Sequence, residues 1–118
     1  MANRRTKVTF PVFSGFPIII ILSDNPQRTS RALRMYRKPL VEQDVDENEM
    51  AAFLSDDHNP LRCWLIFDIK YVDPGTIAHE CSHAVWHMLK TVGVVPDDEV
   101  HAYHTGYLVN KVHKFMKR

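Results

Sequence analysis

The sequence predicts a small α+β domain in which three or four mostly antiparallel strands pack on a helix that carries a metal-binding motif. Three observations predict this fold class. The 118 residues suffice for one compact domain and are too few for two, so we expect a single domain over 1–118. Two runs rich in β-branched and aromatic residues, 17–22 and 61–69, are typical of buried strands. Two helical patterns, 74–92 and 97–117, follow them.

The first half of the chain, residues 1–70, is expected to hold the strands and one helix. An apolar segment over 7–13 contains Pro11, which restricts a strand there to a sheet edge because proline donates no ladder hydrogen bond. Basic residues followed by an apolar stretch over 8–22 are also typical of a signal peptide. However, prolines and a glycine interrupt the stretch, and no small-residue cleavage site follows it. We therefore expect strands here and no membrane segment.

Composition and charge narrow the class of protein. Fifteen Lys and Arg residues against fourteen Asp and Glu residues give a net charge of +1, so the total charge does not point to nucleic acid as a partner. Cys63 and Cys81 are too few and too far apart for a disulfide framework or a thiolate zinc site. We expect both to be small buried residues in a reducing compartment, which places the protein in the cytoplasm.

A helix is expected at 27–37, because residues 24–26 offer an Asx cap followed by a proline suited to the first turn. Arg28, Arg31 and Arg34 then share one side of this helix, which we expect to be solvated. The alternative is a phosphate-binding surface formed with the basic chain ends. Those ends carry Arg4, Arg5, Lys114, Lys117 and Arg118.

The segment before the second strong strand is harder to assign. Residues 39–48 are acidic and lack a hydrophobic period, so we expect an exposed loop. A short strand is expected at 49–54, and a dense turn signal at 55–60 separates it from the strand at 61–69. His58 lies in that turn, and we expect it to be exposed rather than a ligand.

The segment 76–86 contains two candidate metal ligands and a candidate general base. His79 and His83 are four residues apart, so on an α-helix they point the same way and can offer two imidazoles to one zinc ion. Glu80 follows the first of them, where it can accept a proton from a metal-activated water. This is the HExxH pattern. The alternative is an ordinary amphipathic helix whose histidines are incidental.

Start and stop signals delimit the two C-terminal helices. Asp73 or Thr76 can cap the first helix, and Gly93 is a stop signal for it. Asp97 can cap the second, and the acidic residues that follow favour the positive end of its dipole.

A catalytic zinc site uses three protein ligands, so a third residue has to join the histidine pair. Our choice is Glu99, because it opens the helix at 97–117 and small residues on its side let that helix lie close to the motif helix. Asp98 is an alternative. His101 and His104 are rival ligands by type, but they project from a different side of the helix.

Two further residues are candidates for the site. Tyr103 is four residues after Glu99 and can project toward the same pocket, where it would hydrogen-bond a ligand or stabilise an oxyanion. A core position is the alternative for this tyrosine. His87 lies on the motif helix one turn beyond the histidine pair and remains a possible ligand.

The segments IAHECSHAVWHML and DDEVHAYHTGYL, within 76–108, resemble the small zincin-like metallopeptidase domains encoded in phage and prophage genomes. Over the first half of the chain, the resemblance extends only to the general order of the strands. It implies a minimal zincin-like fold whose C-terminal helix supplies the third ligand. By this likeness, His79, His83 and Glu99 are the zinc ligands. Glu80 is then the general base.

The expected function is that of a zinc-dependent hydrolase, and among hydrolases a peptidase, with a peptide or protein as substrate. The strand at 61–69 is expected to line the cleft and offer its edge to an extended substrate. The alternative is a zinc-stabilised, non-catalytic interaction module, such as a virion component or an antagonist of a host protein. An open fourth position on the metal favours the enzyme, and a site closed by further protein ligands favours the module.

Overall fold

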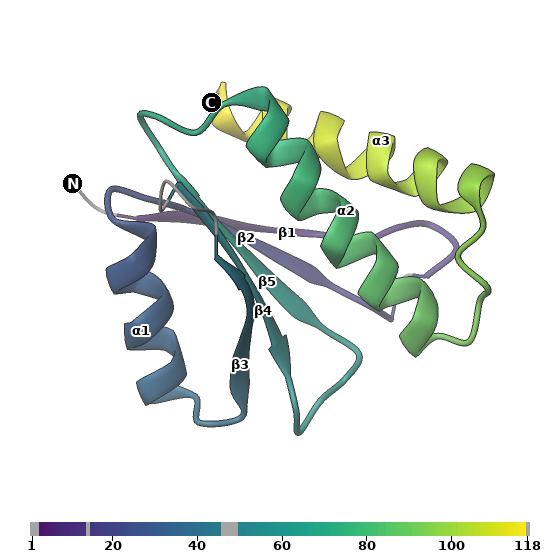
Figure 1. The fold of residues 1–118 in the computed structure, drawn as a ribbon, viewed down its shortest axis with the longest axis horizontal. Helices are drawn as coiled ribbons and strands as arrows, with labels where there is room; N and C mark the ends of the chain where they lie inside the picture. The colour runs from purple at the N-terminus through teal and green to yellow at the C-terminus, as the bar shows by residue number, and fades with distance from the viewer. Residues whose placement is uncertain (1–2, 14, 46–49, 118) are drawn as a thin grey trace.

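The computed structural model describes residues 3–13, 15–45 and 50–117, which form a five-stranded sheet and three helices (Figure 1). In chain order the elements are β1 (Arg4–Val8), β2 (Ile18–Ser23), α1 (Pro26–Tyr36), β3 (Leu40–Val45), β4 (Ala51–Asp56), β5 (Cys63–Asp68), α2 (Pro74–Thr91) and α3 (Asp98–Met116). The helices α2 and α3 cover one face of the sheet, and α1 covers the other.

The strand order is β1-β2-β5-β4-β3. The pair β2–β5 is parallel, and the other three pairs are antiparallel. The α+β class is confirmed, whereas the expected count of three or four strands is wrong because β3 forms within a segment expected to be a loop. The strand expected at 61–69 is also not an edge: β5 pairs with a neighbour on each side, so no substrate strand can add to it.

The acidic composition of β3 is the reason that the sequence did not predict this strand. A strand is easy to recognise when its apolar residues alternate, but here two acidic side chains occupy partly buried positions and find partners. Glu42 accepts a hydrogen bond from Ser30 of α1 and lies 3.6 Å from the Arg34 guanidinium. The second acid, Asp44, faces the other side of the sheet, where it meets α2.

The two central strands form the core, as their composition predicts. Ile20 pairs with Leu65, and both side chains face the cluster under α2 and α3. Ile21 pairs with Ile66, and both face the cluster under α1. Because each fully buried side chain of this size contributes about 1.5–3 kcal/mol, burial on both faces makes β2 and β5 the anchor of the sheet.

The helices begin where their caps predict. Asn25, Asp73 and Asp97 each accept a hydrogen bond from the backbone N–H three residues later. Gly93 has a φ of 83°, a left-handed conformation suited to glycine, and ends the turn after α2. Both C-terminal helices therefore end within one residue of the expected bounds. None of the described helices is long and apolar enough to cross a lipid bilayer.

A buried ion pair closes the turn between β4 and β5. Asp56 is 3% exposed, and its Oδ2 lies 2.7 Å from Nη2 of Arg62. Its Oδ1 accepts hydrogen bonds from the backbone N–H groups of His58 and Asn59. Burial raises the pKa of Asp56, but these hydrogen bonds and the guanidinium charge outweigh burial, and the pKa lies below 3.8.

The variant Asp56→Asn should lower the free energy of unfolding at pH 7 by about 2 kcal/mol, because it removes hydrogen bonds to a charged group. The folded-state pKa is depressed, so this stabilisation is present above pH 3.8 and is lost as pH falls below it. The free energies of unfolding of the wild type and the variant, measured with urea, should therefore converge as pH falls further below 3.8. The matched control is Asp57→Asn, at an exposed neighbour. A difference in the free energy of unfolding between wild type and variant that stays constant with pH would contradict this account.

Candidate metal centre

Three ligand atoms from two elements converge at one point. His79 Nε2 lies 3.2 Å from His83 Nε2 and 3.3 Å from Asp44 Oδ2, and the third separation, from His83 Nε2 to Asp44 Oδ2, is 3.8 Å. A tetrahedral zinc with bonds of about 2.0–2.1 Å places its ligand atoms about 3.3 Å apart. The three atoms therefore fit one ion, and this is the only such group within residues 3–13, 15–45 and 50–117.

The histidine pair comes from α2 as the motif predicts. Four residues separate His79 from His83, so the two rings lie one above the other, with centroids 4.7 Å apart. Their side chains are 60% and 46% exposed, so the site opens toward solvent. The ring of His83 lies parallel to that of Phe53 on β4, at a centroid separation of 6.3 Å. This packing fixes one imidazole against the sheet.

The third group reaches the site through a β-bulge. Glu42 pairs with Leu54 and Asp44 pairs with Phe53, so Gln43 is an extra residue between the two pairs. Leu54 faces α1 and Phe53 faces α2. Residues two apart on a regular strand share a face, so without the bulge Asp44 would point toward α1. The extra residue turns it toward the histidines.

A hydrogen bond holds the bulged residue in place. Gln43 donates from Nε2 to Ser55 Oγ on β4, at 2.9 Å. Bulges commonly redirect a side chain beside a functional site, and this one lies next to the ligand cluster.

Glu80 lies below the cluster rather than in it. Its side chain is fully buried, and its Oε1 lies 4.0 Å from His79 Nε2. A side-chain hydrogen bond with Glu80 is the largest influence on the pKa of Asp44 and lowers it. Burial opposes this change, and the charges of His83 and His79 add to it, so the net pKa lies below 3.8. Asp44 is thereby favoured in the ionised form that binds a cation.

The acidic residues in the first turn of α3 do not lie at the metal centre. Asp98 and Glu99 are both exposed in the first turn of α3, and neither belongs to the group whose ligand atoms converge. Tyr103 is 73% exposed, and its ring contacts His104 rather than the histidine pair. The structure therefore brings Asp44, and not Glu99, to the motif histidines.

The two histidines of α3 are engaged in other hydrogen bonds, His101 with α2 and His104 within α3 itself. His101 Nε2 lies 3.1 Å from the carbonyl oxygen of Ser82, which can only accept, so this nitrogen donates. His104 donates in the same way from Nδ1 to the carbonyl oxygen of Val100, at 2.8 Å. Neither histidine belongs to the ligand group.

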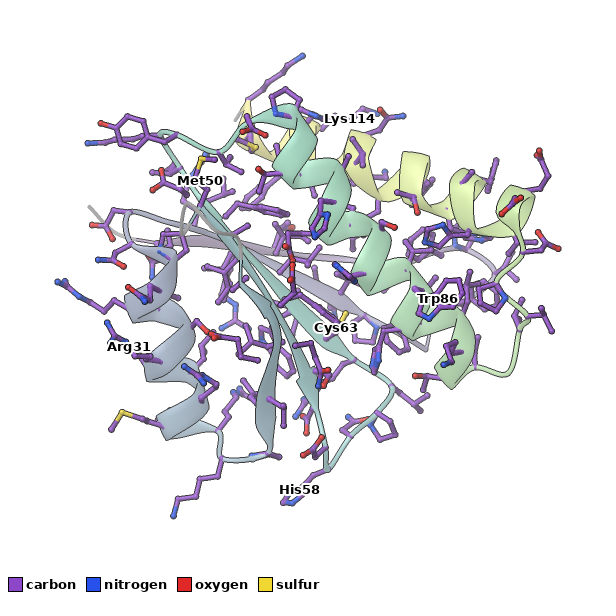
Figure 2. The ribbon with its side chains drawn as sticks, viewed as in Figure 1. Arg31, Met50, His58, Cys63, Trp86 and Lys114 are labelled. Carbon is purple, nitrogen blue, oxygen red and sulfur yellow. The ribbon has the colours of Figure 1, made fainter. Side chains whose placement is uncertain are left out.

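A groove of about 400 Å³ begins at His83 and follows α2 toward its C-terminus. Trp86, Lys90 and the bulged Gln43 line it. Figure 2 shows the Trp86 side chain on the outer side of α2, and its residue is 47% exposed. His87 lies deeper, where burial lowers its pKa against a hydrogen bond with the Pro60 backbone. It is one turn beyond the cluster and outside it.

Both cysteines are buried and free, as expected. Burial raises the pKa of each thiol, and the nearby Glu80 adds to this effect for Cys81. Neither cysteine belongs to the group of converging ligand atoms, which leaves the site with nitrogen and oxygen donors. His58 is exposed, also as expected.

No known protein family, curated protein sequence or solved structure matches the chain. The fold and the site define its class by themselves: a small α+β protein with two imidazoles and one carboxylate converging at the surface of a mixed sheet.

The variant Asp44→Asn should weaken zinc binding by more than about 100-fold, the upper end of what loss of an outer-shell partner costs. The isosteric amide keeps the shape of the side chain but removes its charge. Glu99→Gln is the matched control and should leave the affinity unchanged. Competition with a chromophoric chelator measures both. If instead Glu99→Gln weakens zinc binding and Asp44→Asn leaves it normal, the third ligand belongs to α3.

Deletion of Gln43 should remove the bulge but leave Asp44 directly after Glu42, opposite Phe53 and on the α2 face, so that zinc affinity stays within a few-fold of the wild type. The variant Gln43→Ala keeps the residue count and should retain affinity within a few-fold. Thermal unfolding without metal checks that both variants fold. If the deletion variant folds but no longer binds zinc, the pairing of Asp44 with Phe53 is not what places this ligand on the α2 face.

Proposed function

We propose that this protein is a zinc-dependent hydrolase of the minimal zincin type, acting on peptides. The single observation that carries the proposal is the convergence of Asp44, His79 and His83 at tetrahedral spacing. Two imidazoles and one carboxylate suit zinc, and three protein ligands are the set found in catalytic rather than structural zinc sites. The likeness of the motif helix to phage-encoded zincin-like domains supports the same class.

The open side of the site supports an enzyme. A catalytic zinc keeps one position for water or substrate, whereas a structural zinc is closed by a fourth protein ligand. The two ligand histidines are about half exposed, and the described residues offer no fourth ligand atom within reach of the group. His101 and His104, the nearest candidates by type, donate their hydrogen bonds to carbonyl oxygens instead.

Glu80 is the proposed proton carrier. Zinc bound at this site would supply Lewis acidity, polarising a scissile carbonyl and activating water. Glu80 Oε1 lies 4.0 Å from His79 Nε2, within the reach of one intervening water. To act as the base, Glu80 would first have to lose the proton that it shares with Asp44; once ionised, its carboxylate would accept the proton of the attacking water and deliver it to the leaving amine.

The free edge of β3 supports a peptide substrate. In the described part of the sheet, β3 pairs only with β4, and Asp44 lies on this edge strand. An extended peptide that adds to the edge would pass beside the ligand cluster. The groove that begins at His83 would then take one of its side chains against the exposed face of Trp86.

A zinc-stabilised interaction module is the second candidate. The observation that favours it is the complete burial of Glu80, whose carboxyl bonds to Asp44 rather than facing solvent. In that role Glu80 would orient a ligand, and the ion would hold an edge strand to a helix.

The variant Glu80→Gln distinguishes the hydrolase from the interaction module. It should lower kcat by about 10²–10⁴-fold, because the amide cannot accept a proton. Zinc should remain bound, because the amide N–H can still donate to Asp44. Glu80→Ala should lose both activity and about 10–100-fold of zinc affinity. Hydrolysis of a quenched-fluorescent peptide library and metal analysis measure these effects. Turnover that survives in Glu80→Gln would remove the proposed mechanism.

A further inference from the structure

A second groove lies far from the metal centre, between β1 and the C-terminal half of α3. It has a volume of about 360 Å³ and is lined by Lys111 and Lys114 of α3 and by residues of the edge strand β1, among them Lys7. Lys7 pairs with Ile19, which packs toward α1, so the Lys7 side chain leaves the strand edge on the opposite face from the two α3 lysines. Tyr107 lies in the same groove. The three α3 residues are spaced four and three apart, so they share one face of the helix. Figure 2 shows Lys114 near the C-terminal end of α3.

Charge is strongly segregated around this groove. Segments 4–8 and 107–117 carry six of the fifteen Lys and Arg residues and none of the fourteen Asp and Glu residues. The rest of the chain therefore has nine basic residues against fourteen acidic ones. The net charge of +1 is an average over two regions of opposite sign, which is why composition alone did not point to an anionic partner.

The lysine ammonium groups of the groove are not neutralised by any carboxylate in the described part of the chain. Lys7, Lys111 and Lys114 form no ion pair with any carboxylate of residues 3–13, 15–45 and 50–117; the pairs of Arg34 and Arg62 lie elsewhere. The Lys111 ammonium lies 5.3 Å from the Tyr107 ring centroid, so it is held at the groove wall. Two unpaired cations on the α3 wall, with Lys7 at the neighbouring strand edge, attract a repeating anion.

We propose that this groove binds the phosphate backbone of single-stranded nucleic acid, independently of the metal centre. Lysine is a point charge well suited to phosphate, and a positively charged groove that follows the backbone is the usual device for binding a single strand. The contacts of this groove are to backbone charges, so binding should be insensitive to base sequence.

Two simpler explanations account for only part of the surface. Lysines on an open edge strand discourage sheet-to-sheet association, which explains Lys7 but not the two lysines of α3. The arginines of α1 do not extend the surface, because Arg28 and Arg31 lie on the helix that covers the opposite face of the sheet. The two α3 lysines and the α1 arginines thus lie on opposite faces of the sheet.

The test measures fluorescence anisotropy of a labelled 12-nucleotide single strand at several NaCl concentrations, in zinc-free and zinc-loaded protein. The triple variant Lys7→Gln, Lys111→Gln, Lys114→Gln should bind at least about tenfold more weakly at low salt. The slope of log K against log [salt] should fall by about 2, since each lost phosphate contact on a single strand is worth about 0.7. Zinc affinity should not change.

The charge-matched control replaces three exposed basic residues on the α1 side: Arg28→Gln, Arg31→Gln and Lys38→Gln. It should bind within twofold of the wild type. Equal losses in both triple variants would mean attraction by net charge alone and would overturn the site, as would unchanged binding by the lysine variant. A duplex of the same length that binds as tightly, or a polyglutamate that competes equally, would overturn the assignment to single-stranded nucleic acid. If the lysine variant self-associates but binds the single strand as tightly as the wild type, the lysines serve only to prevent sheet-to-sheet association, and the proposed site is wrong.

Discussion

One register shift in the sheet determines where the chemistry can occur. The extra residue Gln43 places Asp44 on the face opposite Glu42, although the two acids are only two positions apart. Glu42 thereby binds α1 and Asp44 meets the α2 histidines. Without this shift the histidine pair of α2 would have no carboxylate partner, and β3 would present both acids to the same helix. The bulge thus links the pairing of an edge strand to the composition of the site.

The proposed ion would connect parts of the fold that share little else. The edge strand β3 has a sheet neighbour on one side only, whereas α2 is packed on the central core. An ion bound by Asp44 and the histidine pair would tie the two together, contributing about 2.7 kcal/mol to stability at a free metal concentration 100 times Kd. The buried Glu80 reinforces this link, because it bonds to the carboxylate ligand from within the same helix as the histidines.

Local signals predicted much of the fold. Caps and stop residues located the helices, and apolar β-branched runs located β2 and β5. The edge strand β3 was missed because LVEQDV has only weak apolar alternation and its acids are satisfied by distant side chains. The choice of third ligand depended on how α3 crosses α2, which local pattern does not encode. In the structure α3 contacts α2 through His101 and Ser82, and the acids of its first turn do not belong to the group that converges at His79 and His83.

The central claim is that one divalent ion binds Asp44, His79 and His83 together. Anomalous diffraction at the zinc absorption edge, from crystals grown with one equivalent of zinc, tests it most directly. The account predicts a single anomalous peak about 2.0–2.2 Å from one carboxylate oxygen and two Nε2 atoms of these residues. A peak coordinated by Glu99 instead, or no peak between the two imidazoles, would contradict it.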